Sequence, residues 1–277
     1  IDGLAETGDD AMIIAGGQTL VPMMAMRLAR PALLIDVNGI GDLQGIDSGQ
    51  GNVRIKACTR QADALASSII HDRLPLLAKA LPHIGHTQTR NRGTVGGSIA
   101  LGDPAAEIPL VATALNARIT LRNKEGTREV PTNGFYEGPL MTTREPDECI
   151  TEVNFPLWVE EGRLGTGFQE VNLRHGDFAI VAAAAQILIG EDGICRKASV
   201  ALGGVHGYPL RASAAEEILT GTAIDEAAIE AAADTIDEAM EPGNDLHASA
   251  AYRRRVAKVL VTRVIREALD DAAGEAP

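Results

Sequence analysis

The sequence predicts an α+β protein built from two parts that meet near residue 160. Before residue 160, short apolar strands alternate with helical stretches, whereas after it three strands come first and three helical segments follow. The chain's 277 residues also exceed the usual size of one domain. We therefore expect residues 1–156 and 165–277 to form separate domains, joined by the charged and weakly patterned residues 157–164.

The first part opens with a strand–turn–helix–strand unit. The apolar strands "AMIIAGG" and "ALLIDV" flank a predicted helix over 19–30, and Gly16-Gly17 stand at the turn between strand and helix. We expect this unit to be a subdomain of about residues 1–37, followed by a second subdomain over 38–156. The elements predicted in that second subdomain are a strand over 52–59, helices over 60–68 and 75–85, a helix beginning near Pro104, a hairpin around 124–126 and a strand over 148–156.

The second part begins with strands and ends with helices. Strands are predicted over 165–171, 178–189 and 195–202, and helices over 212–219, 225–240 and 248–273. The last helix is amphipathic, and its predicted buried face carries Tyr252, Val256, Val259, Leu260 and Val264. Gly203-Gly204 is interpreted as the end of a strand.

Composition narrows the class of protein. Hydrophobic residues make up 45% and charged residues 23%, as in ordinary globular proteins. The net charge of −13 disfavours binding to nucleic acid or to anionic membranes. The longest apolar run, Phe178 to Gly190, is too short to span a bilayer. Three separated cysteines without a C-x-x-C pair indicate reduced thiols in a cytoplasmic protein, and no histidine or cysteine spacing predicts a metal site.

Two glycine pairs carry the functional signal. Gly16-Gly17 and Gly96-Gly97 each follow an apolar residue and are soon followed by a hydroxyl residue. Glycine lets backbone N–H groups point outward and lets a ligand approach the chain closely. One such pair is usually a plain turn, but two predict a pyrophosphate clamp made of backbone, which suits an acidic protein. Neither pair forms a G-x-G-x-x-G or P-loop motif.

The residues around both pairs resemble a known family. "AGGQTLVPMMAMRLARPALLIDVNGI" and "TRNRGTVGGSIALGDPAAEIPLVATAL" are similar to the two flavin-pyrophosphate motifs of the FAD-binding medium subunit of molybdenum hydroxylases, a group that includes carbon monoxide dehydrogenase and xanthine dehydrogenase. Thr19 replaces the usual serine, and Ser98 replaces the usual Asn or Asp. Three further blocks follow in family order: "NGFYEGPLMTTREPDECI", "FQEVNLRHGDFAIVAAAA" and "ALGGVHGYPLRASAAEEILTG".

The resemblance implies a fold and a set of site residues. The implied fold is a two-subdomain FAD-binding domain of the PCMH or vanillyl-alcohol-oxidase type, then a C-terminal domain of a three-stranded antiparallel sheet and a helical bundle. Family chains usually carry further residues before the first motif, so either residues precede Ile1 in the native protein or this region is short here. The cofactor-binding residues implied are Ala15, Gly16, Gly17, Gln18, Thr19 and Leu20 in the first pyrophosphate loop, Thr94, Gly96, Gly97 and Ser98 in the second, Asp103 and Glu107 near the ribityl chain, Leu140 near the phosphates and adenine, and Arg174 and Asp177 at the isoalloxazine edge.

Two features near these residues leave alternatives open. Glu170 and Asn172 stand where many family members carry lysine or arginine, so the redox potential and the electron acceptor are not fixed by the resemblance. Arg90 and Arg92 either pair with acidic neighbours at the surface, or bind the flavin phosphates or order the loops. No residue is assigned a catalytic role, and no metal is expected on this chain.

The function implied is electron transfer within a larger complex. The family's medium subunit binds FAD non-covalently and receives electrons from [2Fe-2S] clusters on a small subunit, after oxidation of a substrate at a molybdenum-cofactor large subunit. We expect a dimer of such heterotrimers, with NAD, a quinone or another molecule as the acceptor. The alternatives are a self-standing NAD(P)H-dependent flavin reductase, for which the sequence shows no second dinucleotide motif, and a non-enzymatic scaffold, which the intact glycine pairs disfavour.

Overall fold

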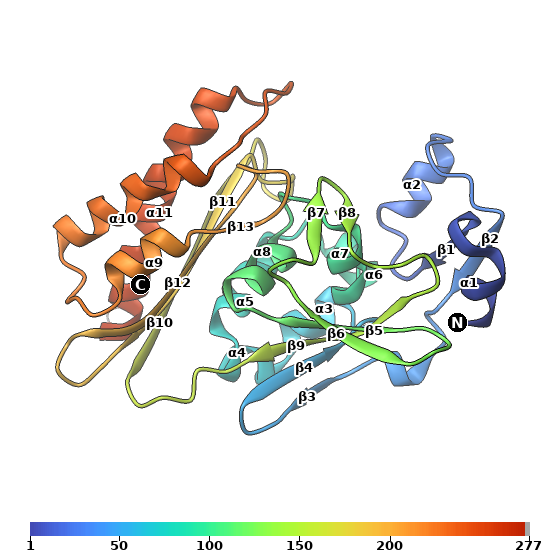
Figure 1. Ribbon diagram of the computed structural model, residues 1–277, viewed down its shortest axis with the longest axis horizontal. Helices are drawn as coiled ribbons and strands as arrows, with labels where there is room; N and C mark the ends of the chain where they lie inside the picture. The colour runs from blue at the N-terminus through green and yellow to red at the C-terminus, as the bar shows by residue number, and fades with distance from the viewer. Residues whose placement is uncertain (275–277) are drawn as a thin grey trace.

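The structure is a computed structural model that describes residues 1–274. Three units follow one another along the long axis of the molecule: an N-terminal unit around β1 and β2, a central sheet with its helices, and a second sheet backed by α9, α10 and α11 (Figure 1). None of the helices within residues 1–274 combines the length and the apolar character needed to span a bilayer. The mixed α and β architecture agrees with the fold class predicted from the sequence.

The N-terminal unit is small and its sheet has two parallel strands. Strand β1 (Ala11–Ile14) pairs with β2 (Leu33–Asp36), and the short helix α2 (Leu20–Ala25) lies in the connection between them. Helix α1 (Asp2–Thr7) and the 3₁₀ turn η1 (Gly8–Asp10) precede β1. The helix predicted over 19–30 is therefore too long. It ends at Ala25 because Arg27 takes a left-handed φ of 61°, which a helix cannot contain.

The central unit is a five-stranded antiparallel sheet in the order β3-β4-β9-β5-β6. Its strands are β3 (Ile46–Ser48), β4 (Asn52–Lys56), β5 (Arg118–Arg122), β6 (Thr127–Pro131) and β9 (Cys149–Pro156). Alternation in β4 buries Val53 and Ile55 completely, as its sequence pattern predicted. The hairpin predicted around residues 124–126 is confirmed as the β5–β6 pair.

Six short helices belong to the central unit, and some of them contact the C-terminal sheet and not the central one. They are α3 (Gln61–Ala66), α4 (Ser68–Arg73), α5 (Pro75–Ala80), α6 (Thr87–Arg92), α7 (Val95–Leu101) and α8 (Glu107–Ala114). The same unit contains the 3₁₀ turns η2 (Gly41–Leu43) and η3 (Leu81–His83) and a small hairpin of β7 (Tyr136–Gly138) and β8 (Met141–Thr142). Helix α8 begins at Glu107 and not near Pro104 as predicted. The Asp103 carboxylate accepts the Ala105 amide at 2.8 Å and holds a turn there, and Ala106 is extended with ψ of 139°.

The C-terminal sheet is antiparallel and buried on both faces. Its long strands are β10 (Arg163–Val171), β11 (Val181–Ile189) and β12 (Cys195–Gly203), and the two-residue β13 (Leu210–Arg211) extends it. All nine residues of β11 are buried. Alternate side chains of β11 contribute to two cores, because Ala182 and Ala184 face the central unit while Ala183 and Ala185 face the helices.

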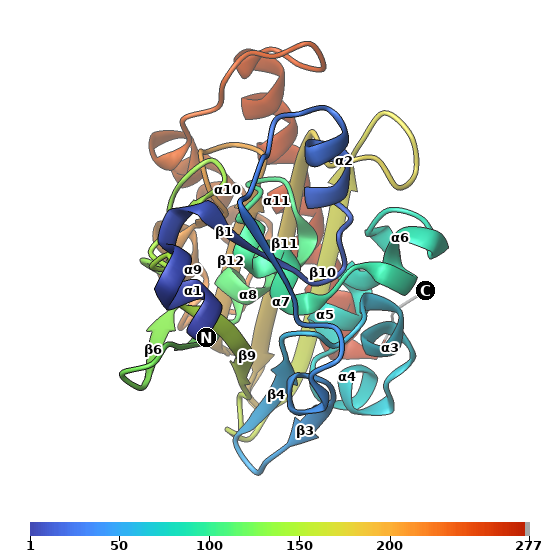
Figure 2. The ribbon, with the colours of Figure 1, turned by 90° about the vertical axis from the view of Figure 1, so that its right-hand side faces the viewer.

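The outer face of this sheet is covered by α9 (Ser213–Leu219), α10 (Glu226–Ala239) and α11 (Ala250–Ala273) (Figures 1 and 2). A side chain at Gly167 would approach the Val264 Cα to 3.0 Å, so glycine lets α11 lie directly on β10. The buried face predicted for α11 is wrong at one position. Val259 is 44% exposed, because two residues turn the helix by about 200° and place it opposite Val261.

The central unit and the C-terminal sheet are joined by a shared core and a polar clamp. The Lys79 ammonium on α5 donates to the Thr166 carbonyl oxygen on β10 at 2.5 Å and lies 3.3 Å from Glu267 and Asp271 on α11. Asp271 also accepts both the amide and the hydroxyl of Thr166 at 2.8 Å. The division predicted at residues 157–164 lies between β9 and the start of β10, and it remains a prediction about how the parts fold.

Candidate functional site

The first glycine pair lies in an open loop between β1 and α2. Gly17 has a left-handed φ of 70°, which glycine adopts without a steric cost. The backbone amides from Gly16 to Leu20 have no hydrogen-bond acceptor among the described residues. Gln18 turns back and donates to the Gly16 carbonyl oxygen at 3.2 Å, which stabilises the loop. A run of free amides of this kind can bind the oxygens of a phosphate or pyrophosphate.

This loop packs directly against the segment that precedes the second glycine pair. A side chain at Gly16 would overlap with the Arg92 carbonyl oxygen and would lie 2.8 Å from the Gly93 Cα. Gly16 is therefore required for the contact between two backbones that are far apart in sequence. The two glycine segments predicted to act together are brought side by side.

Asn38 and Arg60, which the sequence analysis missed, tie the two segments together. The Asn38 amide donates to the Ala15 carbonyl oxygen at 2.8 Å. The Arg60 guanidinium donates both to the Asn38 side-chain oxygen at 2.7 Å and to the Arg92 carbonyl oxygen at 2.5 Å. Asn38 lies two residues after β2 and Arg60 directly precedes α3, but only the tertiary structure shows that they meet.

The second glycine pair is not a turn, which corrects the prediction. Gly96 and Gly97 lie in the first turn of α7, whose N-cap is Thr94. The Thr94 hydroxyl accepts the Gly97 amide at 3.1 Å, and the Gly96 amide donates to the Ala57 carbonyl oxygen at 2.8 Å. Both amides thus have partners within the protein, whereas those of the first loop are free. The prediction failed because a glycine pair signals a turn more often than a capped helix start.

Packing explains why Gly96 is glycine. An added Cβ at this position would lie 2.5 Å from the Ala57 Cβ and 2.6 Å from its Cα, at the end of β4. At Gly97 the added atom would meet the Thr94 hydroxyl at 2.7 Å, with nothing else closer than 4.0 Å. Gly97 and Ser98 are half-buried, so this side of the α7 start remains accessible.

Asp103 and Glu107, two of the acidic residues predicted to bind the cofactor, follow α7 and are shielded from water. Glu107 is 5% exposed at the start of α8, and burial raises the pKa of its carboxyl to about 7, helped by the charge of Glu170. Burial also raises the pKa of Asp103. A carboxyl group at either position can accept a hydrogen bond from a ligand hydroxyl, and Glu107 can also donate one while it is protonated.

Glu170 is buried rather than placed at the surface. Its side chain is 2% exposed, and one carboxylate oxygen lies 3.2 Å from His83 Nδ1 and accepts the Asn172 amide at 2.7 Å. The other oxygen is buried without a partner among the described residues. The hydrogen bond to Glu170 raises the pKa of His83.

The remaining predicted residues lie on two exposed loops. Leu140, in the β7–β8 turn, has a φ of 58°, is 53% exposed and donates its amide to the Gly102 carbonyl oxygen at 3.3 Å. Arg174 and Asp177 are exposed in the β10–β11 loop, where the Asp177 amide donates to the Arg174 carbonyl oxygen. This loop is fixed at Gly176, whose missing side chain leaves room for His86.

The contacts of Arg90 favour a role in ordering a loop over an ion pair with an acidic neighbour at the surface. Its guanidinium donates to the carbonyl oxygens of Ile84 at 2.8 Å and Gly85 at 3.0 Å. No carboxylate pairs with it among residues 1–274. Arg90 therefore orders the turn that contacts Gly176 of the β10–β11 loop.

The site as a whole suits a diphosphate that carries a polyhydroxylated chain. The free amides from Gly16 to Leu20 match the oxygens of a pyrophosphate, and Asp103 and Glu107 match hydroxyl groups further along a ligand. The accessible start of α7 lies beside the amides because Gly16 contacts Arg92 and Gly93. These observations fit FAD, whose pyrophosphate and ribityl groups have this chemistry.

Two family models match the chain. The model for the FAD binding domain in molybdopterin dehydrogenase matches residues 2–158, and the model for the CO dehydrogenase flavoprotein C-terminal domain matches residues 166–268. Together they account for both the N-terminal and the C-terminal parts described above.

Individual relatives agree along nearly the whole chain. The 6-hydroxypseudooxynicotine dehydrogenase complex subunit alpha of Paenarthrobacter nicotinovorans is 39% identical over 97% of this chain and 90% of its own length. The nicotine 6-hydroxylase medium subunit of the same organism is 37% identical over 96% and 92%. Among solved structures, a carbon monoxide dehydrogenase chain from Hydrogenophaga pseudoflava superposes with a TM-score of 0.93 at 37% identity, covering 98% of this chain and 93% of that one.

Proposed function

This chain belongs to the family of FAD-binding medium subunits of molybdenum hydroxylases, and from that membership we propose that it relays electrons through FAD from a partner's iron–sulfur clusters to an external acceptor. It is an oxidoreductase flavoprotein subunit, and FAD is its cofactor. The run of free amides from Gly16 to Leu20 is the structural observation that supports this proposal most directly.

The chain's own residues would bind and orient the flavin. The amides of Gly16, Gly17, Gln18, Thr19 and Leu20 would hold the pyrophosphate, because they are neutral donors in an acidic protein. When bound, FAD supplies the redox chemistry, while the protein supplies position and electrostatics. Asp103 and Glu107 would bind the ribityl hydroxyls, since their burial leaves the carboxyl groups poorly hydrated.

The segment from Thr94 to Ser98 would contribute to the shape of the flavin site more than it would donate hydrogen bonds to the cofactor. Thr94, Gly96 and Gly97 form hydrogen bonds within the chain, and Gly97 and Ser98 remain partly accessible to a ligand. Leu140 would cover the phosphate end, and Arg174 and Asp177 would border the ring edge from the β10–β11 loop. These assignments rest on the resemblance to the family.

Molybdenum cofactor and [2Fe-2S] clusters belong to the large and small subunits that accompany such medium subunits. We propose a dimer of these heterotrimers. The three cysteines of this chain are buried free thiols, which favours a reducing compartment such as the cytoplasm.

Rapid-mixing spectroscopy of the flavin tests the relay. The FAD-loaded chain is mixed, without oxygen, with its iron–sulfur subunit that has been chemically reduced and freed of excess reductant. We expect the flavin absorbance to bleach in proportion to the reduced subunit added. The same chain without partners should not oxidise a hydroxylase substrate.

A different result would contradict the proposal. Sustained oxidation of NADH by the isolated chain, as fast as by the complete complex, would identify a self-standing reductase instead. Failure of the reduced small subunit to bleach the flavin, while the assembled complex is active, would place the flavin outside the electron path.

A further inference from the structure

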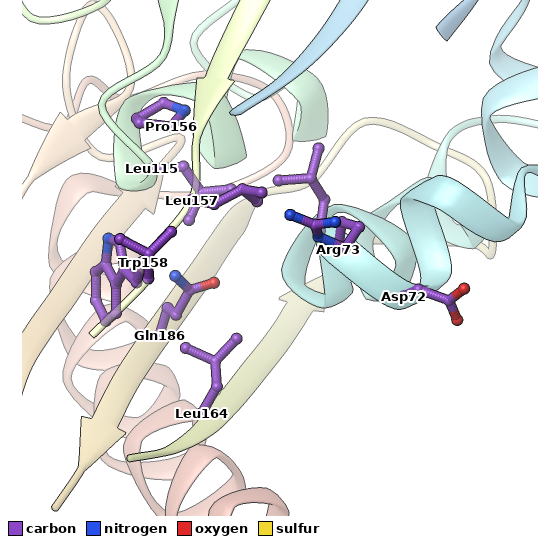
Figure 3. A pocket seen from close by; sticks show the side chains of 10 residues that line it. Asp72, Arg73, Leu115, Pro156, Leu157, Trp158, Leu164 and Gln186 are labelled. Atoms are coloured by element: carbon purple, nitrogen blue, oxygen red, sulfur yellow. The ribbon is translucent and has the colours of Figure 1, made fainter. Parts of the chain in front are cut away.

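A cavity of about 340 Å³ lies at the junction of the central unit and the C-terminal sheet. It is bordered by the end of α4, the end of β9, the residues that follow β9, and strands β10 and β11 (Figure 3). None of the residues predicted to bind flavin lines this cavity. Its volume falls in the range of small-molecule sites.

The lining combines apolar side chains with a larger share of polar surface. Leu115, Leu157 and Leu164 line the cavity together with Trp158, whose ring stands along one wall (Figure 3). Lys197 lies 4.7 Å from the centroid of this ring, which helps to hold it in place. The Trp158 ring therefore offers one flat apolar surface on which the ring of a ligand can pack.

Gln186 supplies a buried polar group at the base of the cavity. It is 4% exposed and stands in β11 among alanine, isoleucine and leucine residues. Its carboxamide has no hydrogen-bond partner among the described residues and points into the space between Leu157, Trp158 and Leu164 (Figure 3). The amide atoms of Gln186 are accessible from the cavity, so water or a ligand there can bond to them.

Arg73 supplies a positive charge at the mouth. Its guanidinium lies on the cavity side, whereas the neighbouring Asp72 carboxylate points away (Figure 3). The guanidinium contacts the Gly49 carbonyl oxygen at 3.4 Å, which is long for a hydrogen bond, and no carboxylate within residues 1–274 pairs with it. It is therefore free to bind an anion.

We propose that this junction cavity binds a small aromatic carboxylate. The ring packs on Trp158 and the leucines, the Gln186 amide bonds to the ligand's polar end, and Arg73 balances its negative charge. The site is separate from the flavin site, and a bound ligand contacts both the central unit and the C-terminal sheet. Occupancy therefore stabilises the junction between them, as any ligand selective for the folded state does.

Trp158 gives a direct measurement, because it is the single tryptophan of the sequence. The full chain, with and without FAD, is titrated with benzoate while tryptophan fluorescence is recorded and calorimetry measures the affinity. We expect a saturable change with benzoate, a weaker response to uncharged benzamide, and none to acetate, which lacks the ring.

Variants locate the binding. Gln186→Leu and Arg73→Gln should each weaken benzoate binding by about tenfold, as expected for the loss of one polar contact. Arg54→Gln, which removes an exposed arginine outside the cavity, should leave the affinity unchanged. Circular dichroism checks folding, and the exposed Arg73 provides a variant whose folding does not depend on the buried sheet.

The proposal fails if benzoate gives no saturable response at concentrations of about 10 mM, which would correspond to a cavity filled by water alone. It also fails if acetate acts as strongly as benzoate. Unchanged affinity in both Gln186→Leu and Arg73→Gln would show that benzoate binds elsewhere.

Discussion

The two glycine pairs have the same sequence but are needed for different physical reasons. At Gly16-Gly17 the backbone is open, one residue is left-handed, and the following amides are free. At Gly96-Gly97 the backbone is helical, and its amides are bonded to Thr94 and Ala57. The first pair offers donors to a ligand, whereas the second lets a helix start pack against a strand.

This difference shows that a glycine motif does not define one mechanism of phosphate binding. At the first loop a substitution should damage the ligand site more than the fold. At Gly96 a substitution should damage the fold more than the ligand site, because the neighbours of this residue are atoms of the protein itself. The following substitutions test this contrast.

The largest effect is expected for Gly96→Val. Its side chain would collide with the Cα and Cβ of Ala57, and overpacking of a rigid core costs about 1–3 kcal/mol or more. We expect loss of the folded protein, or a strongly lowered unfolding midpoint, by thermal denaturation. Gly97→Ala is the matched control, since it meets only the Thr94 hydroxyl. Equal stability of the two variants would refute the packing explanation.

Gly17→Ala should affect FAD more than folding. The left-handed φ of 70° costs a side-chain-bearing residue about 1–2 kcal/mol, and any relaxation would turn the free amides out of line. We expect an FAD affinity reduced by at least about tenfold, measured by fluorescence titration of the apoprotein.

Gly8→Ala is the control for Gly17→Ala, because Gly8 has a φ of 59° at the opposite end of β1. Its ψ of −135° lies outside the left-handed helical region, so Gly8→Ala should lower stability at least as much as Gly17→Ala and leave FAD affinity unchanged. Normal FAD binding by Gly17→Ala would remove the first loop from the flavin site.

Glu107→Gln should change how stability depends on pH. The carboxyl's pKa rises from 4.5 to about 7 on folding, so protonation favours the folded state. This contribution is complete below pH 4.5 and is lost as the pH rises toward 7. Glutamine does not ionise, so the variant should gain stability relative to the parent across this window.

Urea denaturation of the apoprotein at several pH values measures this effect. The exposed Glu137→Gln is a control for the loss of a charge. A constant difference between Glu107→Gln and the parent from pH 4.5 to 7.5 would contradict the burial of an ionisable group at this position.

The smallest effect on the free energy of unfolding is expected for substitutions at the N-caps of α7 and α2. Thr94→Val removes the hydroxyl that accepts the Gly97 amide and should cost about 1 kcal/mol of unfolding free energy. Thr19→Val should cost less, because the Thr19 hydroxyl caps no amide of α2. Equal losses of unfolding free energy in the two variants, measured by chemical denaturation, would contradict this difference between the two helix starts.

The sequence predicted the long elements well because their patterns are strong. The strands β10 to β12 and the helices α10 and α11 lie within two or three residues of their predicted positions. Short elements such as α4, α6 and α7 escaped, since six or seven residues hold too little periodicity. At α7 the glycine pair also concealed a helix whose cap is visible only once Thr94 is seen to accept the Gly97 amide.

The candidate site could be predicted in its residues but not in its contacts. The glycine pairs were singled out by their backbone chemistry and the acidic residues by the family resemblance, while Asn38 and Arg60 carry no motif. Their role depends on the approach of the Ala15 and Arg92 backbones, which are distant in sequence. The burial of Glu170 likewise depends on His83, from a different unit of the fold.

The polar clamp at Asp271 sets a condition on folding during synthesis. Asp271 accepts the amide and hydroxyl of Thr166 and lies beside Lys79, so residues 105 and 192 positions apart in the sequence must meet. The central unit can form early on the ribosome, but the inner face of β10 gains this contact only after Asp271 has emerged. Until then, the apolar face that later receives α11 remains exposed to chaperones.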